Sequence, residues 1–590
     1  MPTAISAILS ARGAQRPIFA PDGHSLYYCS DRTGRMQLWR TPVAGGRHEQ
    51  LTDLDRVGRY AVSPDATRIA LGADSGGNER WQILVMPATG GEPRDITATP
   101  DRIHHLVDWT PDGSEIVVAA NRRDPRYFDF HDFPLDGGEP RCRFQHDGTG
   151  DGAAVLPDGA LVVRTDRARG DRNHLFLVRP DGRTDRLTPD EPAALHGVPC
   201  SQNGSLLVRS DRGRDFVGVA RMDLTGGYTP LLAPDADIEA IAACGEHWAY
   251  AVNVDGRSEL HRVDGGRDTR VAGLPPGAVA IDQFGESLAV APDGSVAVAW
   301  ALFDAPIAIW VAPPGADARP AIDLGLAGID RSDLPDAELV WWPTFDGRRI
   351  PGFLLRGRSA NGPRPTIVQV HGGPEGQARP LWNPLTVALV AEGFGVLQPN
   401  VRGSTGYGRA YQSLDDVRLR MDSVRDLDAA AAWLAGTGAA PADRIGVIGA
   451  SYGGYMTLAA TAFFPERWAA AVSIVGIGNW ITFLERTDPW RRPLREAEYG
   501  TIEHDRAFLE SISPIGRLDA IRAPLMVIHG ANDPRVSVYE AEQMVAALRD
   551  RGREVAYLRY EDEGHGLAKA ANRADAWPKV VEFFRAHLMR

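Results

Sequence analysis

A turn that resembles Ser-Pro-Asp-Gly recurs along the first half of this 590-residue chain and limits its fold more than any other feature. Neighbouring copies lie 42 to 48 residues apart. Proline presets the first dihedral angle of such a turn, aspartate caps it locally, and glycine accepts a positive φ, so each copy predicts a tight turn between two strands. Five copies are clear and two are degraded, and their centres are Asp22, Asp65, Asp112, Asp158, Asn203, Gly245 and Asp293.

The segments between these turns repeat as well. Each copy continues with an apolar strand such as residues 24–30, a polar turn, a second strand such as residues 36–42, and a glycine-rich hairpin. A period of about 45 residues is enough for four strands, which make one blade of a β-propeller. A blade cannot bury both of its faces alone, so blades stack radially. The even spacing therefore predicts a seven-bladed β-propeller over residues 1–325, not an irregular β-sandwich, with residues 1–15 free to pack on the following domain instead.

The pattern changes beyond a Pro/Gly/Ala-rich stretch at residues 313–327. An antiparallel pair of strands is expected first, after which short apolar strands alternate with helical stretches. Such alternation implies β-α-β units and a mostly parallel sheet. The second predicted domain, residues 326–590, is therefore an α/β domain.

Charge and cysteine content exclude several classes of protein. The chain has 77 acidic against 64 basic residues, a net charge of −13, whereas binders of nucleic acid or anionic membranes need a basic surface. Its four cysteines lie far apart, without the close pairs of zinc or redox sites. No signal-like or membrane-spanning stretch is evident. We expect a cytoplasmic protein with no metal and no nucleic-acid or membrane partner, and leave a homo-oligomer open.

One motif in the second half predicts a nucleophile. Ser451 lies in Gly-Ala-Ser-Tyr-Gly-Gly, between the apolar strand at residues 445–448 and the helical stretch at residues 456–464. This G-x-S-x-G element, in a strand-to-helix turn, is typical of the α/β-hydrolase fold, where it exposes the serine hydroxyl. The second domain is therefore predicted to be an α/β-hydrolase domain.

A serine hydroxyl needs a base to take its proton and an acid to orient that base. His565 is the predicted base, because it lies in a glycine-flanked loop after the strand at residues 555–560, whereas His587 lies in the closing helix. Asp533 is the predicted acid, because it follows the end of a strand, where α/β sheets place their ligands. The order Ser, Asp, His is that of α/β-hydrolases.

The negative oxygen of a tetrahedral intermediate needs hydrogen-bond donors. The backbone N–H of Tyr452, directly after the nucleophile, is the first candidate. Gly373, in the His-Gly-Gly-Pro loop at residues 371–374, is the second, because a missing side chain lets the main chain approach the substrate. A simple glycine turn is the alternative interpretation of this loop.

Five stretches of the second half together resemble the prolyl oligopeptidase family of serine peptidases, and its acylaminoacyl-peptidase branch in particular. They are HGGPEGQ (371–377), NVRGSTGYGRAYQ (400–412), GASYGGYM (449–456), HGANDPRV (529–536) and EGHG (563–566). The resemblance implies a propeller that covers the active site and admits only short or unfolded peptides. It also implies hydrolysis through an acyl-enzyme, with neither a metal nor an organic cofactor.

The same resemblance indicates residues for specificity. Trp480, Phe483 and Trp490 correspond to the pocket for the side chain before the scissile bond and would favour an apolar or aromatic group there, with core packing as the alternative. Val536 is a further candidate for substrate contact. Glu79 is the lone candidate for holding a free N-terminal amine, since the paired glutamates of family aminopeptidases are missing, and a solvated charge is its alternative.

We therefore expect a serine oligopeptidase that acts on short peptides, of the acylaminoacyl-peptidase type. The same triad would also serve an esterase or a specialised amidase or isopeptidase, because it cleaves any acyl bond that it can reach. A dipeptidyl aminopeptidase is a further alternative, which the missing glutamate pair disfavours. A propeller scaffold without catalysis is disfavoured by the complete triad.

Overall fold

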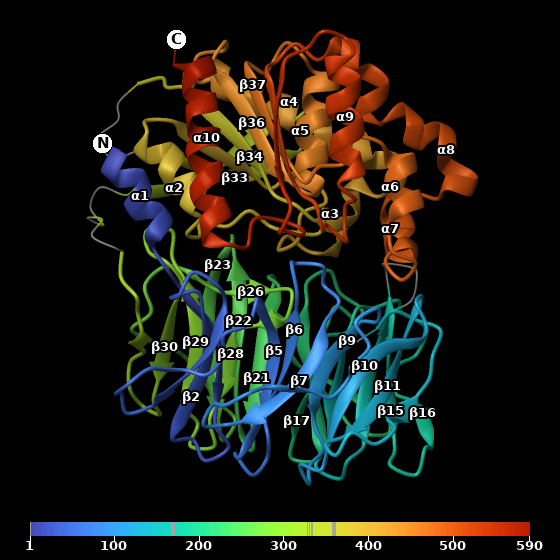
Figure 1. Cartoon of the computed structure of the whole chain (residues 1–590). Coiled ribbons are helices and arrows are strands. Elements are labelled where there is room, and N and C mark those ends of the chain that lie inside the picture. Colours follow the sequence, from blue (N-terminus) through green and yellow to red (C-terminus); the bar gives the residue numbers. More distant parts are fainter. Residues whose placement is uncertain are drawn as a thin grey trace.

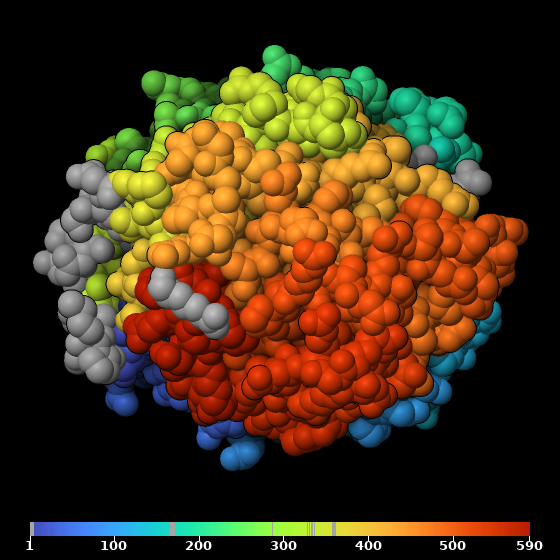
Figure 2. Space-filling model, turned by 90° about the horizontal axis from the view of Figure 1, so that it is seen from above, coloured from blue at the N-terminus to red at the C-terminus, as the bar shows by residue number. Residues whose placement is uncertain are grey.

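The computed structural model has two domains stacked on one another, a ring of sheets below and an α/β domain above (Figure 1). It describes residues 2–150, 152–166, 172–326, 329, 331, 334, 336–356 and 362–589. Viewed from above, the α/β domain covers the centre of the ring and the sheets emerge only around its rim (Figure 2). One open end of the ring is therefore closed by the second domain.

The ring is a seven-bladed β-propeller, as the repeat predicts. Every blade is an antiparallel sheet; the strands of the first six follow one another in sequence order, whereas in the seventh both β25 and β28 pair with β29. The strands of blades one to four are β1 (Ala14–Phe19), β2 (Ser25–Ser30), β3 (Gln37–Pro42), β4 (Glu49–Gln50), β5 (Arg56–Val62), β6 (Arg68–Asp74), β7 (Gln82–Pro87), β8 (Arg94–Asp95), β9 (His104–Trp109), β10 (Glu115–Asp124), β11 (Tyr127–Pro134), β12 (Arg141–Phe144), β13 (Gly152–Val155), β14 (Leu161–Asp166), β15 (Asn173–Val178) and β16 (Thr184–Arg186).

The last three blades complete the ring. Their strands are β17 (Cys200–Gln202), β18 (Ser205–Ser210), β19 (Gly218–Met222), β20 (Tyr228–Leu232), β21 (Ile238–Cys244), β22 (His247–Val254), β23 (Arg257–Asp264), β24 (Arg267–Arg270), β25 (Ala278–Val279), β28 (Leu288–Val290), β29 (Val296–Ala301), β30 (Ala308–Ala312) and β31 (Arg319–Ile322). A small separate hairpin, β26 (Ile281–Asp282) and β27 (Gly285–Glu286), is inserted in the seventh blade.

The repeated turns join the first and second strands of the blades. Even the degraded copies do so: Asn203 and Gly204 have φ angles of 46° and 73° and connect β17 to β18. The ring closes where the N–H of Ala14 donates to the carbonyl of Ile307 at 2.9 Å, so the first blade meets the seventh. Regular turn chemistry, not strand composition alone, accounts for the correct prediction of this domain.

The second domain is built on one eight-stranded sheet in the order β32-β33-β35-β34-β36-β37-β38-β39. The first strands pair antiparallel and those from β35 onward pair parallel. Its strands are β32 (Asp336–Pro343), β33 (Arg349–Arg356), β34 (Thr366–Val370), β35 (Gly395–Pro399), β36 (Ile445–Ala450), β37 (Ala470–Ile474), β38 (Leu525–Gly530) and β39 (Val555–Tyr560). This is the mixed sheet expected of an α/β-hydrolase domain.

Helices cover both faces of the sheet. They are α1 (Pro2–Ser10), α2 (Pro384–Ala391), α3 (Arg409–Gln412), α4 (Arg420–Gly436), α5 (Tyr452–Phe463), α6 (Trp480–Arg486), α7 (Arg492–Tyr499), α8 (Ile502–Ser511), α9 (Tyr539–Arg549) and α10 (Ala570–Leu588), with short 3-10 turns η2 (Ser413–Asp415), η3 (Val417–Leu419) and η4 (Pro514–Ala520). One core joins the sheet to α4, α5 and α9, and a second joins its other face to α2 and α10. Among the described residues, no helix is long and apolar enough to cross a membrane.

The N-terminal helix α1 lies apart from the propeller that follows it. Figure 1 shows α1 beside α2 and α10, and its residue Ile8, 1% exposed, belongs to the core beneath them. The first propeller strand begins only at Ala14. The α/β domain therefore receives a helix from each end of the chain.

Candidate active site

Ser451 sits at a sharp turn between β36 and α5. Its φ and ψ angles of 59° and −121° are unusual for a residue with a side chain, and its N–H donates to the carbonyl of Ile474 at 2.9 Å. Such strain persists only where the surroundings impose it. In the described structure the Ser451 hydroxyl has no hydrogen bond, so it is free for a reacting group.

The glycines around Ser451 are required by close backbone approaches. A Cβ atom at Gly449 would lie 2.2 Å from the carbonyl oxygen of Gly453, and one at Gly453 would lie 2.3 Å from that of Val370. A Cβ atom at Gly454 would lie 2.6 Å from the Cα of Gly476. No larger residue fits at these positions, so the motif is a steric requirement of the turn.

Asp533 and His565 form a direct pair, as expected of an acid and its base. Nδ1 of His565 lies 2.7 Å from Oδ2 and 3.0 Å from Oδ1 of Asp533. The Asp533 side chain is fully buried, whereas that of His565 is 11% exposed. Because Nδ1 faces the carboxylate, Nε2 is left to accept a proton, and it has no hydrogen-bond partner in the described part of the chain.

Further donors hold Asp533 in its ionised form. The N–H groups of Arg535 and Val536 donate to Oδ1 at 2.8 and 3.0 Å, and Nε2 of the buried His529 lies 3.4 Å from Oδ2. Burial alone would raise the pKa of Asp533, but His565 and His529 outweigh it and hold the pKa below its usual range. Val536 itself, 3% exposed, lies in the core and supports the acid through its backbone.

Two backbone N–H groups near Ser451 are available as oxyanion donors. Tyr452 is the first residue of α5, where helix N–H groups lack intrahelical partners. The loop at Gly372 passes directly beside the nucleophile, since a Cβ atom there would lie 3.4 Å from the Cβ of Ser451. The next residue, Gly373, has a φ of 136°, and within the described structure neither its N–H nor that of Tyr452 is engaged.

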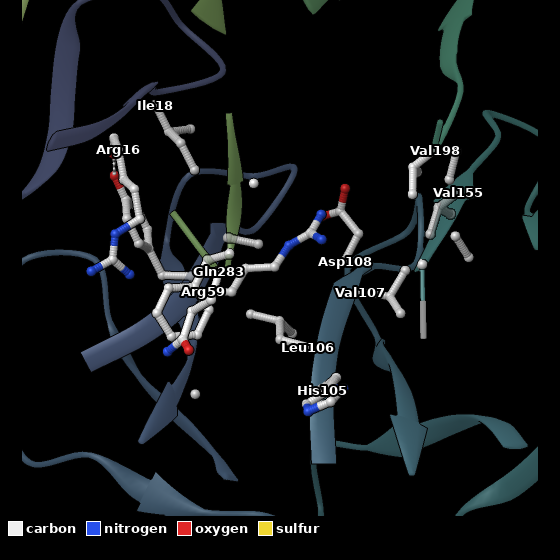
Figure 3. A pocket seen from close by; sticks show the side chains of 18 of the residues that line it. Arg16, Ile18, Arg59, His105, Leu106, Val107, Asp108, Val155, Val198 and Gln283 are labelled. Atoms are coloured by element: carbon white, nitrogen blue, oxygen red, sulfur yellow. Dashed lines mark hydrogen bonds between the residues drawn. The ribbon is translucent and has the colours of Figure 1, made fainter. Parts of the chain in front are cut away.

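One cavity is the central channel of the propeller, about 1020 Å³ in volume. The first strands of the blades line it, with Arg59 and Asp108 projecting toward its middle (Figure 3). Trp490, Arg491 and Arg535 of the α/β domain form its upper boundary. The loop that carries Asp533 therefore opens onto a chamber enclosed by both domains.

Glu79 lies at this boundary as part of a buried ion cluster. One carboxylate oxygen lies 2.6 Å from Nη2 of Arg491 and the other 2.6 Å from Nη2 of Arg535. Burial would raise the pKa of Glu79, but the two arginines outweigh it and lower the pKa. Glu79 is only 6% exposed, so the alternative interpretation of this residue as a solvated surface charge is wrong.

The predicted aromatic residues divide into two groups. Trp480 and Phe483, 0% and 3% exposed, lie in the hydrophobic core with Tyr455 and Tyr499. Trp490 lines the channel cavity instead, with its ring 5.3 Å from that of Phe128 in the third blade. Of the three, Trp490 is the one that lines the channel.

A second cavity, about 820 Å³, lies between the domains on the other side of α7. The loop that passes Ser451 enters it at Glu375, and Asp416 and Glu498 lie on the same wall. Enclosure and the charge of Glu498 raise the pKa of Glu375 to about 7, and enclosure raises that of Asp416 to about 6. Glu498 is paired with Arg420, but Glu375 and Asp416 have no ion-pair partner among the described residues, so this part of the cavity favours a cation.

Sequence reasoning missed this group of carboxylates. Asp416 and Glu498 are 82 residues apart and look like solvated helix charges. A signal existed for Glu375 alone, which lies two residues after Gly373 in the loop beside the nucleophile.

A model of the prolyl oligopeptidase family matches residues 382–590, which contain the Ser451, Asp533 and His565 group. The chain is a serine peptidase whose residues 382–590 match the prolyl oligopeptidase family. The first oxyanion candidate, Tyr452, also lies within the matched residues, whereas Gly373 precedes them.

Relatives of this peptidase carry different names. Dipeptidyl aminopeptidase BIII of Pseudoxanthomonas mexicana is 27% identical over 97% of this chain and 86% of its own length. Acylamino-acid-releasing enzyme 2 of Oryza sativa is 28% identical, but over only 38% of this chain and 30% of its own. A puromycin-hydrolysing peptidase of Mycobacterium tuberculosis has the same fold, with a TM-score of 0.87, 21% identity, and coverage of 99% of this chain and 96% of that one. The expected acylaminoacyl-peptidase branch thus receives partial support only.

Proposed function

We propose that this peptidase hydrolyses short peptides through an acyl-enzyme at Ser451. The observation that carries the proposal is the Asp533–His565 pair, with Nδ1 and Oδ2 2.7 Å apart, together with a serine at the β36–α5 turn whose hydroxyl has no hydrogen bond among the described residues. Ser451 Oγ would attack the scissile carbonyl carbon while Nε2 of His565 takes its proton. The carbonyl oxygen, now negative, would accept from the N–H groups of Tyr452 and Gly373.

Collapse of this intermediate would release the amine, which takes the proton from His565, and leave an ester at Ser451. A water molecule would then repeat the sequence with His565 as base. Asp533 would remain ionised throughout and hold the imidazole by Nδ1, in keeping with its lowered pKa. Because the propeller encloses the approach from below, folded proteins would not reach the serine, and the substrates would be short or unfolded peptides.

We infer that the free amino end of the peptide is recognised in the second cavity. Glu375, Asp416 and Glu498 line that cavity near the loop that passes Ser451, and no arginine is paired with Glu375 among the described residues. Of the three arginines that line the same cavity, Arg379 and Arg409 are paired with Glu239 and Asp211 at 2.9 and 3.5 Å, and Arg209 donates to the carbonyl of Glu239. Because Glu498 is already paired with Arg420, an ammonium group would serve Glu375 and Asp416, which have no ion-pair partner among the described residues.

Replacing Glu375 with glutamine should raise KM for peptides with a free amino end by about tenfold or more, because a charged hydrogen bond is lost. In the wild type, KM should also rise below about pH 7, where Glu375 takes up a proton, and above pH ~8, where the peptide amine loses one. Steady-state kinetics from pH 5.5 to 9 measures both effects.

N-acetylated peptides are the matched control, since they share His565 chemistry but carry no ammonium group. Their KM should be unchanged by Glu375→Gln. The variant Glu246→Gln removes an exposed charge at the β21–β22 turn and should change KM for neither the free nor the acetylated peptides. Equal effects of Glu375→Gln on free and acetylated peptides would contradict amine recognition.

A second candidate is hydrolysis of acylated peptides, which one observation favours. Glu79 of the propeller pairs with Arg535, which lies in the same loop as Asp533, and with Arg491. These two arginines already neutralise it, so it offers no charge to an amine. A panel of free, N-acetylated and p-nitrophenyl ester substrates separates the candidates. Preference for the acetylated peptide would establish the acylaminoacyl type, and activity on the ester alone would indicate an esterase.

A further inference from the structure

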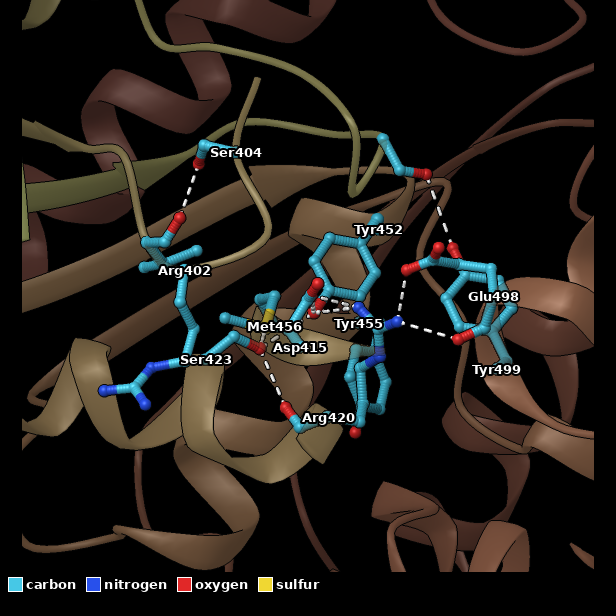
Figure 4. A network of polar contacts seen from close by, with 12 residues as sticks. Arg402, Ser404, Asp415, Arg420, Ser423, Tyr452, Tyr455, Met456, Glu498 and Tyr499 are labelled. Atoms are coloured by element: carbon cyan, nitrogen blue, oxygen red, sulfur yellow. Dashed lines mark hydrogen bonds and ion pairs between the residues drawn. The ribbon is translucent and has the colours of Figure 1, made fainter. Parts of the chain in front are cut away.

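A buried polar network lies behind both candidate oxyanion donors (Figure 4). At its centre is Arg420, the first residue of α4, whose side chain is 0% exposed. Its guanidinium forms ion pairs with Asp415 and Glu498. Burial of an arginine is costly unless its donors find partners, and here each terminal nitrogen has two, whereas Nε has none among the described residues.

One arm of the network reaches the nucleophile turn. Nη1 of Arg420 donates to the Tyr452 hydroxyl at 3.0 Å, and the same hydroxyl lies 2.9 Å from Oγ of Ser423 and 3.2 Å from Asp415. Tyr452 directly follows Ser451, and its own N–H is the first candidate donor. Fixing the end of its side chain therefore limits rotation of the backbone that carries that N–H.

The other arm reaches the loop at Gly373. Nη2 of Arg420 donates to the carbonyl of Glu498 at 3.0 Å, and the next residue, Tyr499, donates from its hydroxyl to the carbonyl of Gly373 at 3.3 Å. The guanidinium also lies 4.9 and 5.1 Å from the ring centres of Tyr499 and Tyr452. A single planar group thus contacts the supports of both donors.

We propose that Arg420 is a positioning residue of the oxyanion hole, which sets the separation of the Tyr452 and Gly373 N–H groups through Tyr452 and Tyr499. The guanidinium suits this role because its donors keep a fixed planar geometry, which lysine lacks. Misplacing oxyanion donors weakens contacts made in the transition state and leaves substrate binding intact. The inference rests on the proposed function.

Two conservative substitutions test the role of Arg420 without creating a large cavity in the core. Tyr452→Phe and Tyr499→Phe each delete one hydroxyl of the network and keep the ring, and each should lower kcat by about tenfold with KM nearly unchanged. Tyr455→Phe is the matched control, because Tyr455 packs in the same aromatic cluster but donates to the carbonyl of Ile512 at 3.2 Å, outside the network. It should leave kcat unchanged.

Inhibition by a peptide aldehyde distinguishes positioning of the oxyanion donors from a purely structural role of the network. Ser451 Oγ adds to the aldehyde carbon, its proton passes to His565, and the resulting oxyanion occupies the hole. The inhibition constant of the aldehyde should weaken by the same factor as kcat/KM in both variants, whereas that of the corresponding peptide acid should not change. Arg420→Lys should lower kcat further, and Arg420→Met most of all.

Equal kcat losses in all three tyrosine variants, or lost kcat with unchanged aldehyde affinity, would overturn the inference even if the Arg420 variants fail to fold. Fluorophosphonate labelling of the wild type separates this result from failure of the proposed function. Labelled wild-type protein with unaffected tyrosine variants would refute only the role of Arg420, whereas absence of labelling would refute the serine mechanism itself.

Discussion

Replacing Ser451 with alanine should lower kcat/KM for a short peptide by at least about 10⁴-fold, the loss typical of a removed nucleophile. The Ser451 hydroxyl is the group at the β36–α5 turn that can form the acyl-enzyme. Because it has no hydrogen bond among the described residues, it can attack a substrate without first breaking one. Asp533→Asn should cost about 10⁴-fold in kcat as well, because the amide would favour the wrong tautomer of His565. Initial rates with a chromogenic peptide measure both losses.

Ser511→Ala is the matched control, since Ser511 is exposed at the end of α8. It should retain full activity and full reaction with a fluorophosphonate probe, while Ser451→Ala should not be labelled. A labelled Ser451→Ala protein would assign the nucleophile to another residue.

Replacing Glu79 with glutamine should destabilise the protein by about 3 kcal/mol or more, because a broken buried ion pair leaves uncompensated charge. Burial already lowers the pKa of Arg491 to about 10, and Glu79 is the carboxylate that opposes this shift most. Arg535, the second partner, donates its N–H to Asp533, so kcat should fall together with stability. Urea unfolding and peptide hydrolysis measure the two effects.

An exposed pair in the same propeller provides the comparison. Glu49 lies 2.8 Å from Arg40, with side chains 39% and 27% exposed, and Glu49→Gln should cost less than about 1 kcal/mol. If Glu79→Gln were as mild as Glu49→Gln and retained full kcat, the cluster would not couple the propeller to the Asp533 loop.

The propeller was predictable because its signal is local. Each Pro-Asp-Gly turn fixes a hairpin within a few residues, and seven copies at even spacing leave few other ways to bury the strands. The β26–β27 hairpin was missed for the same reason: its two-residue strands have neither a repeat nor an apolar pattern. Its tip contributes Gln283, which hydrogen-bonds Arg535 in the other domain.

The acid–base pair of the site was predictable and its surroundings were not. Ser451, Asp533 and His565 follow strand ends in the order typical of α/β-hydrolases, and the contact between Asp533 and His565 agrees with that topology. The partners of Glu79 lie 412 and 456 residues away in sequence, and no local pattern links them. The ion pairs of Arg420 are likewise invisible in sequence, where a charged residue at the start of a helix looks like a solvated one.

The position of α1 has a consequence for biosynthesis. The propeller is complete once Ile322 has been made, before any strand of the α/β sheet exists, yet Ile8 of α1 belongs to a core that contains helices α2 and α10, which are made later. One of these helices, α10, spans Ala570–Leu588, so α1 finds this partner only after all strands of the α/β sheet have been made. Synthesis of the α/β domain, rather than completion of the propeller, is therefore the event that lets α1 pack against its core.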